Sequence, residues 1–181
     1  MHKQTFRETI RLIKSDLPGY CEPFLKAALF IPGFKYTLHH RLCHYFSLRW
    51  WTKPLFVLWW IYTKHLTYLF GIQTAWNKPL PENFVIAHFG GITFFPESCG
   101  RNVYLRQGVT VGGANRLGPG ESQRHPRIGS NVIFGANAIV VGDIEIGDGT
   151  IIAAGAVVTH STPKNSVVAG VPARVIKIRK V

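Results

Sequence analysis

Two histidines in this sequence stand in settings where an imidazole can do chemistry. His88 comes directly before a Phe-Gly-Gly segment, and His125 follows Arg124 at the end of a polar stretch. A neutral imidazole is a base poised near pH 7, which suits the removal of a proton from a hydroxyl group. For His125 three roles stay open: a second acid or base, a contact to substrate, or the end of a loop before Pro126.

The polar stretch from Gly112 to Pro126 is rich in turn-forming residues and interrupts a regular pattern on either side. In a repeat protein such an insertion maps to a loop on one face, often the binding face. Nearby glycines, Gly90, Gly91, Gly112 and Gly113, are expected first of all to be turn residues at positive φ. Any contact of these glycines with a ligand would be additional.

The pattern that must position these residues is a period of six in the second half of the chain. The residues at every sixth position are all apolar: Ile128, Phe134, Val140, Ile146, Ile152 and Val158. Four places further on in each unit the residues are small or β-branched: Val132, Ala138, Ile144, Thr150 and Ala156. This repeat predicts a hexapeptide-repeat parallel β-helix, because a period of six would smear the apolar face of an α-helix.

Before the polar stretch the repeat is looser. Ile86 and Ile92 share one phase, whereas Val103 and Val109 share another. We therefore expect a phase slip in the first coils of the β-helix.

The first part of the chain reads as helical. All five Trp and 17 of the 23 aromatic residues precede position 81, whereas 15 of the 18 Gly follow it. Apolar spacing and Pro or Gly punctuation predict helices over about 5–17, from about 23, over 34–48 and over 54–70. The expected division is a helical region at 1–71 and a β-helix at 72–181, with an inserted loop at about 112–126.

Composition excludes several classes of protein. A chain of 181 residues that is 46% hydrophobic, with no wholly apolar run longer than eight residues, is expected to be globular and to span no membrane. The N-terminus shows no signal-peptide pattern, and the three cysteines suit free thiols, so a cytoplasmic location is expected. The net charge is +12, but residues 81–181 hold only 10 Lys and Arg against 6 Asp and Glu, which argues against nucleic-acid binding.

Four motifs resemble those of hexapeptide-repeat acyltransferases, on the branch that holds serine acetyltransferases and related capsule and surface-polysaccharide O-acetyltransferases. They are Ala-His-Phe-Gly-Gly-Ile at 87–92, Gln-Gly-Val-Thr-Val-Gly-Gly at 107–113, Arg-His-Pro-Arg-Ile-Gly at 124–129, and Ala-Gly-Val-Pro-Ala-Arg-Val-Ile at 169–176. The resemblance implies a left-handed parallel β-helix, a homotrimer, acetyl-CoA as co-substrate without a metal, and active sites between neighbouring β-helices.

The resemblance also assigns site residues. His88 matches the family's catalytic base, with His125 as a second catalytic candidate, and Arg124 matches a residue near the acceptor's carboxylate. Substrate contacts are assigned to Gly90 and Gly91 as well. The positions implied for binding acetyl-CoA are small turn residues and two cations: Gly112, Gly113, Gly135, Ala136, Ala154, Arg174 and Lys177.

Two departures from the serine-specific pattern bear on the acceptor. Serine acetyltransferases carry an Asp just before the catalytic His and another about fifteen residues earlier, where this chain has Ala87 and, approximately, Gln73. We therefore expect a sugar hydroxyl of a surface polysaccharide or its precursor as acceptor, with serine as the alternative. A non-catalytic assembly or membrane-docking subunit is a further alternative. A gamma-class carbonic anhydrase is disfavoured, because His88, His125 and His160 are too widely spaced for a shared zinc site.

A cluster of Trp50, Trp51, Trp59 and Trp60 with neighbouring lysines has two readings. Indole rings and cations favour the headgroup region of a membrane, so peripheral contact with the cytoplasmic face of the inner membrane is one expectation. Packing between subunits would use the same residues and is the other.

Overall fold

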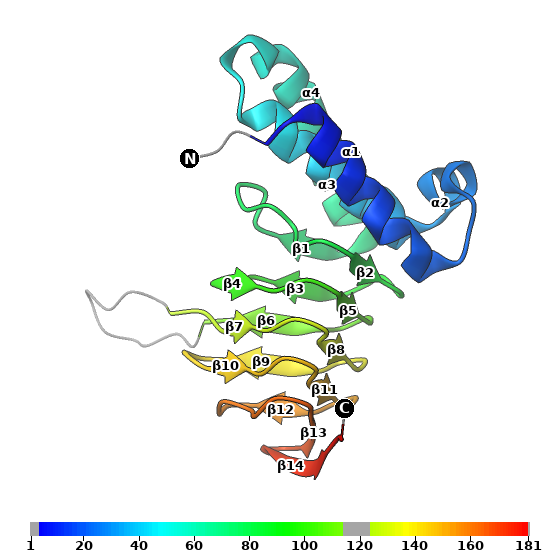
Figure 1. Cartoon of the computed structure of the whole chain (residues 1–181). Helices are drawn as coiled ribbons and strands as arrows, with labels where there is room; N and C mark the ends of the chain where they lie inside the picture. Colours follow the sequence, from blue (N-terminus) through cyan, green and yellow to red (C-terminus); the bar gives the residue numbers. More distant parts are fainter. Residues whose placement is uncertain (1–3, 114–123, 181) are drawn as a thin grey trace.

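The computed structural model describes residues 4–113 and 124–180, and it shows a layer of helices on one end of a three-sided stack of strands (Figure 1). The helices are α1 (Phe6–Asp16), α2 (Phe24–Phe30), α3 (Pro32–Ser47) and α4 (Lys53–Phe70), with 3-10 turns η1 (Leu17–Tyr20) and η2 (Trp50–Thr52). Their positions match the expected helices. A capping box begins α1, since the Thr5 side chain accepts from the Glu8 backbone N–H and the Glu8 side chain accepts from the Thr5 backbone N–H.

The strands that the structure describes form three sheets, and each coil of the stack visits the sheets in turn. Sheet A contains β1 (Ile72–Thr74), β3 (Ile92–Phe94), β6 (Thr110–Gly112), β9 (Ile139–Val141) and β12 (Val157–Val158). Sheet B contains β2 (Phe84–Ile86), β5 (Val103–Leu105), β8 (Ile133–Phe134), β11 (Ile151–Ile152), β13 (Ser166–Gly170) and β14 (Ala173–Ile178). Sheet C contains β4 (Ser98–Cys99), β7 (Arg127–Ile128) and β10 (Glu145–Ile146).

The strand pairings between described coils are parallel, and β13 with β14 is the only antiparallel pair among the described strands. The turns stack into three corners. We call the turns at 87–91, 106–109, 135–138 and 153–156 the His88 corner, and those at 95–97, 113–126, 142–144 and 159–161 the loop corner. The third corner carries Asn83, Asn102 and Asn131 at positive φ, and the amide of each of the first two donates to the next, at 3.0 and 2.8 Å.

The predicted six-residue repeat fills the interior of the stack. All six residues of the series from Ile128 to Val158 are buried, as are the five small or β-branched residues of the second series. A parallel β-helix requires this arrangement, because each coil must rest on the coil below it without bulky residues in the turns.

The expected phase slip is explained by the strand register of the first coils. The strand register aligns Ile86 with Leu105, and Phe94 with Val111. Eight residues therefore separate the aligned positions in the first coil, whereas six separate Leu105 and Val111 in the next. Ile92 and Val109 both belong to the second series, whereas Ile86 belongs to the first. The six-residue spacing between Ile86 and Ile92 therefore does not reflect the repeat. The slip combines a two-residue lengthening of the turn at 87–91 with a one-residue shortening at 95–97, since five residues separate Phe94 from Cys99 and six separate the aligned Val140 and Ile146.

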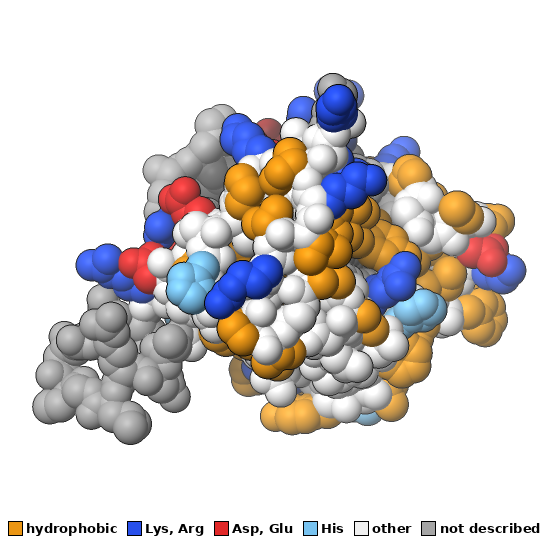
Figure 2. Space-filling model, turned by 90° about the horizontal axis from the view of Figure 1, so that it is seen from below, with side chains coloured by type: hydrophobic (Ala, Val, Ile, Leu, Met, Phe, Trp, Pro, Cys, Tyr) orange, Lys and Arg blue, Asp and Glu red, His pale blue; other side chains and the backbone are white. Residues whose placement is uncertain are grey.

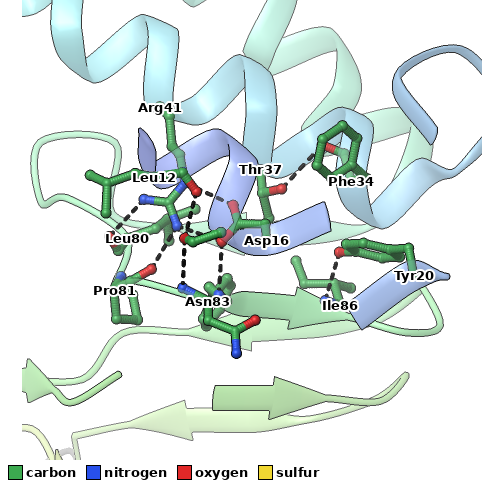
Figure 3. Close-up of polar contacts among 12 residues, drawn as sticks. Leu12, Asp16, Tyr20, Phe34, Thr37, Arg41, Leu80, Pro81, Asn83 and Ile86 are labelled. Atoms are coloured by element: carbon green, nitrogen blue, oxygen red, sulfur yellow. Dashed lines mark hydrogen bonds and ion pairs between the residues drawn. The ribbon is translucent and has the colours of Figure 1, made fainter. Parts of the chain in front are cut away.

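The helical layer is fixed to the first coil by buried polar contacts (Figure 3). Arg41 of α3 pairs with Asp16 of α1, and its guanidinium also donates to the carbonyl oxygens of Leu80 and Pro81 at 2.9 and 2.6 Å. The Asp16 carboxylate accepts from the Phe84 backbone N–H at 2.9 Å. The helices end at Gly71, whose positive φ of 62° caps α4. Independent folding of the two parts as domains stays a prediction.

None of the helices in the described part of the chain is long and apolar enough to cross a membrane. The inserted stretch expected at about 112–126 lies between β6 and β7. Its residues 114–123 lie outside the described residues.

Candidate active site

His88 lies on the lengthened turn that joins β2 to β3. In the coils below, the equivalent turns hold two residues between the strand end and a residue at positive φ: Gly108, Asn137 and Gly155, at 72°, 58° and 68°. In the first coil that residue is Gly91, at 65°, and four residues, Ala87 to Gly90, stand where the other turns have two. The backbone is held on both sides, because the Ala87 N–H donates to Leu105 O and the Gly108 N–H donates to Gly90 O. The insertion therefore presents the exposed His88 side chain at a firmly anchored corner.

His88 lines an open hollow of about 400 Å³ between the turn and the start of α3. Its walls come from both parts of the chain: Ile31, Pro32, Gly33, Ala87, His88, Phe89 and Gln107. Gly33 permits this approach, since a Cβ there would lie 2.0 Å from the carbonyl oxygen of Ile86. None of these described lining residues carries a carboxylate, so the hollow of one chain offers His88 no acidic partner.

The small residues expected to contact acetyl-CoA divide between two corners. Gly135, Ala136 and Ala154 lie at the His88 corner, below His88, together with Gly90 and Gly91. A side chain at Gly135 would lie 2.4 Å from the Ala154 backbone nitrogen, so this glycine is required for stacking of the coils. Gly112 is the last residue of β6, and Gly113 follows it at the loop corner. The expectation of a turn residue at positive φ is wrong for Gly112, and a Cβ there would meet no atom within 4 Å.

Arg124 and His125 lie at the loop corner. Arg124 Nη1 donates to Asp143 Oδ2 at 2.9 Å, and Arg127 Nη1 donates to Asp143 Oδ1 at 2.9 Å. These hydrogen bonds, first from Arg124 and then from Arg127, lower the pKa of the Asp143 carboxyl. His125 is half-buried, and its Nδ1 has no hydrogen-bond partner among the described residues. The loop corner thus presents an ordered guanidinium and an imidazole.

One chain does not bring the two groups of predicted site residues together. Strand β3 runs from the His88 turn to the turn at 95–97, where the Glu97 N–H donates to Pro126 O, next to His125. His88 and His125 therefore lie at opposite ends of sheet A. A site that contains both requires a second chain.

Arg174 and Lys177 project from β14 at the far end of the stack and are exposed. Seen from that end, cationic side chains alternate with apolar ones, among them Val175 and Ile176 (Figure 2). Arg174 lies opposite Ala169 and Lys177 opposite Val167 in the β13–β14 pairing. Both cations are available to an anionic ligand.

Some residues of the site were not predicted from the sequence. Asp143, which holds Arg124, was not singled out, although an acidic residue three places before the repeat residue Ile146 stands out in the printed sequence. The contribution of Ile31, Pro32 and Gly33 to the His88 hollow had no sequence signal, because it depends on how the helices sit on the first coil.

Among residues 4–113 and 124–180, no three His, Cys, Asp or Glu side chains come together as metal ligands would. Burial raises the pKa of the Cys99 thiol to about 12, so that thiol stays protonated at neutral pH.

Comparisons with known proteins agree with this architecture. Residues 125–160 match the family described as bacterial transferase hexapeptide (six repeats). A serine acetyltransferase of Bacillus licheniformis is 32% identical over 178 residues, which cover 97% of this chain and 78% of that protein. The chain belongs to the hexapeptide-repeat acyltransferase family.

Solved structures of hexapeptide-repeat acyltransferases share its fold. A serine acetyltransferase of Neisseria gonorrhoeae has a TM-score of 0.77 and 27% identity, over 96% of this chain and 68% of that chain. A serine acetyltransferase in complex with CoA has a TM-score of 0.71 and 26% identity, over 93% and 68%. The expected left-handed β-helix with helices before it is thereby confirmed.

Within the family, the relatives are serine acetyltransferases. Serine acetyltransferase 2 of Arabidopsis thaliana is 28% identical over 97% of this chain, but the match covers 52% of that protein. The chain spans about half the length of the first curated relatives, between 48% and 60%. The comparisons support the broad family resemblance and do not support the narrower one to polysaccharide O-acetyltransferases.

Proposed function

We propose that this chain is an acetyl-CoA-dependent O-acetyltransferase that acts on a hydroxyl acceptor. The observation that carries the proposal is the lengthened turn, which holds His88 at the head of a corner whose turns at 135–138 and 153–156 consist of small residues apart from Asn137. Family membership and a relative solved in complex with CoA support the same activity. Acetyl-CoA is then a co-substrate, and its phosphates would meet cations such as Arg174 and Lys177.

The proposed reaction is a direct transfer. His88 accepts the proton of the acceptor hydroxyl as its oxygen forms a bond to the acetyl carbonyl carbon. Backbone N–H groups of the turn at Gly90 and Gly91 stabilise the resulting oxyanion. The carbon–sulfur bond then breaks, and the proton passes from His88 to the CoA sulfur. The product is the acetyl ester of the acceptor, and no covalent enzyme intermediate forms.

The active assembly in this proposal is a trimer. His88 and the pair Arg124–His125 lie at opposite ends of sheet A, so neighbouring chains that meet edge to edge complete each site. In the lower coils the outward positions of sheet A are apolar, with Ile139, Val141 and Val157, whereas its upper coils carry Gln73, Thr93 and Thr110 there and the outward positions of sheet C are polar. An apolar outer face supports contact with another chain. A cytoplasmic location stays a prediction.

Serine is the acceptor that the comparisons favour, and it was the alternative expectation. The first relatives and the solved neighbours are named serine acetyltransferases. Arg124, ordered by Asp143, is available for a carboxylate. The expected sugar acceptor is therefore the second candidate.

A sugar hydroxyl keeps one specific observation in its favour. The described residues around His88 include Ala87 and Gln107 but no carboxylate that would pair with the ammonium group of serine. A sugar acceptor needs no such partner.

The deciding experiment incubates the full chain with acetyl-CoA and follows release of CoA thiol. Serine, free sugars, nucleotide sugars and surface oligosaccharides are supplied separately. Thiol release with serine as the best acceptor supports a serine acetyltransferase activity. Release only with a saccharide supports a sugar hydroxyl as the acceptor. Release with none of them, from folded trimeric protein, argues against an acetyltransferase.

A further inference from the structure

The outer face of α4 is an apolar stripe that nothing in the described chain covers. The exposed residues recur at helical spacing: Val57, Leu58, Ile61, His65, Tyr68 and Leu69. All but His65 are apolar, and Tyr68 is 83% exposed. A stripe of this length on a free surface indicates a contact with an apolar phase.

The opposite face of α4 holds the helix in the fold, so the stripe is not needed for folding. Trp59 packs against His39 and Phe46 of α3, at ring-centroid distances of 5.4 and 5.7 Å. Thr63 and Leu66 on the same side are buried. The stripe therefore faces away from the protein, on the end of the molecule opposite β14 (Figure 1).

Indole rings and lysines extend the stripe at its N-terminal end. Trp50 and Trp51 in η2 are 74% and 61% exposed and contact each other edge to face. Lys53 is exposed at the start of α4, and Lys64 Nζ lies 5.8 Å from the ring of Trp60. Indole rings and lysines next to an apolar face are typical of surfaces that lie at the headgroup level of a bilayer.

The charge of this region indicates what kind of surface could cover the stripe. Residues 23–81 contain seven Lys and Arg and no Asp or Glu. Lys26, Arg41 and Lys78 pair with carboxylates outside this range, and the other four, Lys35, Arg49, Lys53 and Lys64, have no carboxylate partner among the described residues. A second copy of the chain would bring the same cations against themselves, which is unfavourable. A surface of negative lipid headgroups is complementary to them.

We propose that the α4 face, defined as η2 with Trp50 and Trp51 together with the apolar stripe of α4, docks on a bilayer that contains anionic lipids. The helix would lie along the interface and would not cross it. The contact is separate from acetyl transfer and does not rest on the proposed function.

The test uses the full chain and sucrose-loaded vesicles, either of phosphatidylcholine alone or of phosphatidylcholine mixed with phosphatidylglycerol. The protein should sediment with the anionic vesicles, and added salt should weaken binding. Trp50→Ala with Trp51→Ala, and separately Leu58→Gln with Ile61→Gln, should each lower the partition coefficient by about tenfold or more. The matched control is Ile176→Gln, an exposed apolar residue (65%) at the far end on β14, which should bind as the unmodified protein does.

A second measurement needs no destabilising variant. Brominated lipid in the anionic vesicles should quench the tryptophan emission of the unmodified protein, and Trp50→Phe with Trp51→Phe should remove most of that quenching. Three results would overturn the proposal: no sedimentation with anionic vesicles, equal binding of the α4 variants and the unmodified protein, or no quenching by brominated lipid. A lower assembly mass in Leu58→Gln with Ile61→Gln, together with absent vesicle binding, would assign the face to a second copy instead.

Discussion

Arg41 and Asp16 form a two-pronged ion pair that is almost wholly shielded from solvent. Arg41 Nε donates to Asp16 Oδ2, and Arg41 Nη2 donates to Asp16 Oδ1, both at 2.8 Å. The side chains are 2% and 0% exposed. Because the same two residues also bond to Leu80, Pro81 and Phe84, the pair ties α1, α3 and the first coil into one unit (Figure 3).

Loss of one partner of this pair should strongly destabilise the protein. Arg41→Met leaves the Asp16 carboxylate buried without its cation, and we expect a loss of about 3–5 kcal/mol in the free energy of unfolding. Urea denaturation measures it. The exposed pair between Arg11 and Glu82 is the matched control, and Arg11→Gln should cost about 1 kcal/mol or less. Equal effects of the two substitutions would contradict this account.

Stability should fall in mild acid because of buried histidines in α3. Burial lowers the pKa of His40 to about 3 and of His39 to about 4, and it lowers the pKa of His44. Below about pH 6.5 the unfolded chain binds protons at these sites and the folded chain does not, so the free energy of unfolding falls as pH falls.

The expected slope from His40 alone is about 1.4 kcal/mol for each pH unit below about 6.5. Urea unfolding at about pH 7.5 and about pH 5 measures this slope. His40→Gln should reduce the slope of the unfolding free energy against pH by the contribution of about one proton. A profile insensitive to His40→Gln would show that other groups set the acid limit.

His88 and His125 should differ in which kinetic constant they control. His88→Ala should lower kcat by about 10²-fold to 10⁴-fold while acetyl-CoA binding is nearly unchanged, because a positioned general base acts only on the proton transfer. His125→Ala should raise the KM of the acceptor more than it lowers kcat. His88 is exposed, so unfolding should be unaffected. The reverse pattern would exchange the two roles.

Two glycines assigned to acetyl-CoA can be separated by their surroundings. Gly135→Ala places a Cβ 2.4 Å from Ala154 N and 2.7 Å from Ala153 C, so it should cost about 1–3 kcal/mol in stability. Gly112→Ala meets open space at a φ outside the left-handed region, so its stability should change by about 0.5 kcal/mol or less. Calorimetric titration with CoA then tests Gly112 directly. Unchanged affinity would remove it from the proposed site.

The repeat made most of the β-helix predictable, because each interior position admits only apolar or small side chains. Ile128 to Val158 could therefore be placed inside without a structure. The lengthened turn could not be located as precisely. Ile86, Ile92 and Phe94 are all apolar, so the sequence alone does not show which of them occupy equivalent positions of the repeat. Strand register, which depends on contacts between coils, was needed to show that the insertion carries His88.

The site was predictable only in part for the same reason. The glycines and His88 follow from local motifs, whereas the separation of His88 from His125 depends on where strand β3 begins and ends. The role of Asp143 depends on two guanidinium groups that reach it from residues 16 and 19 positions earlier.

The lengthened turn also has a consequence for how such enzymes diverge. Its two ends are pinned by hydrogen bonds to the next coil, while His88 and Phe89 lie outside the regular stack. Residues can therefore be added, removed or exchanged in this segment without a shift in the register of any strand. The strands of the β-helix keep their register while reactive groups in the turns change position. A new acceptor preference can therefore evolve, or be engineered, one turn at a time.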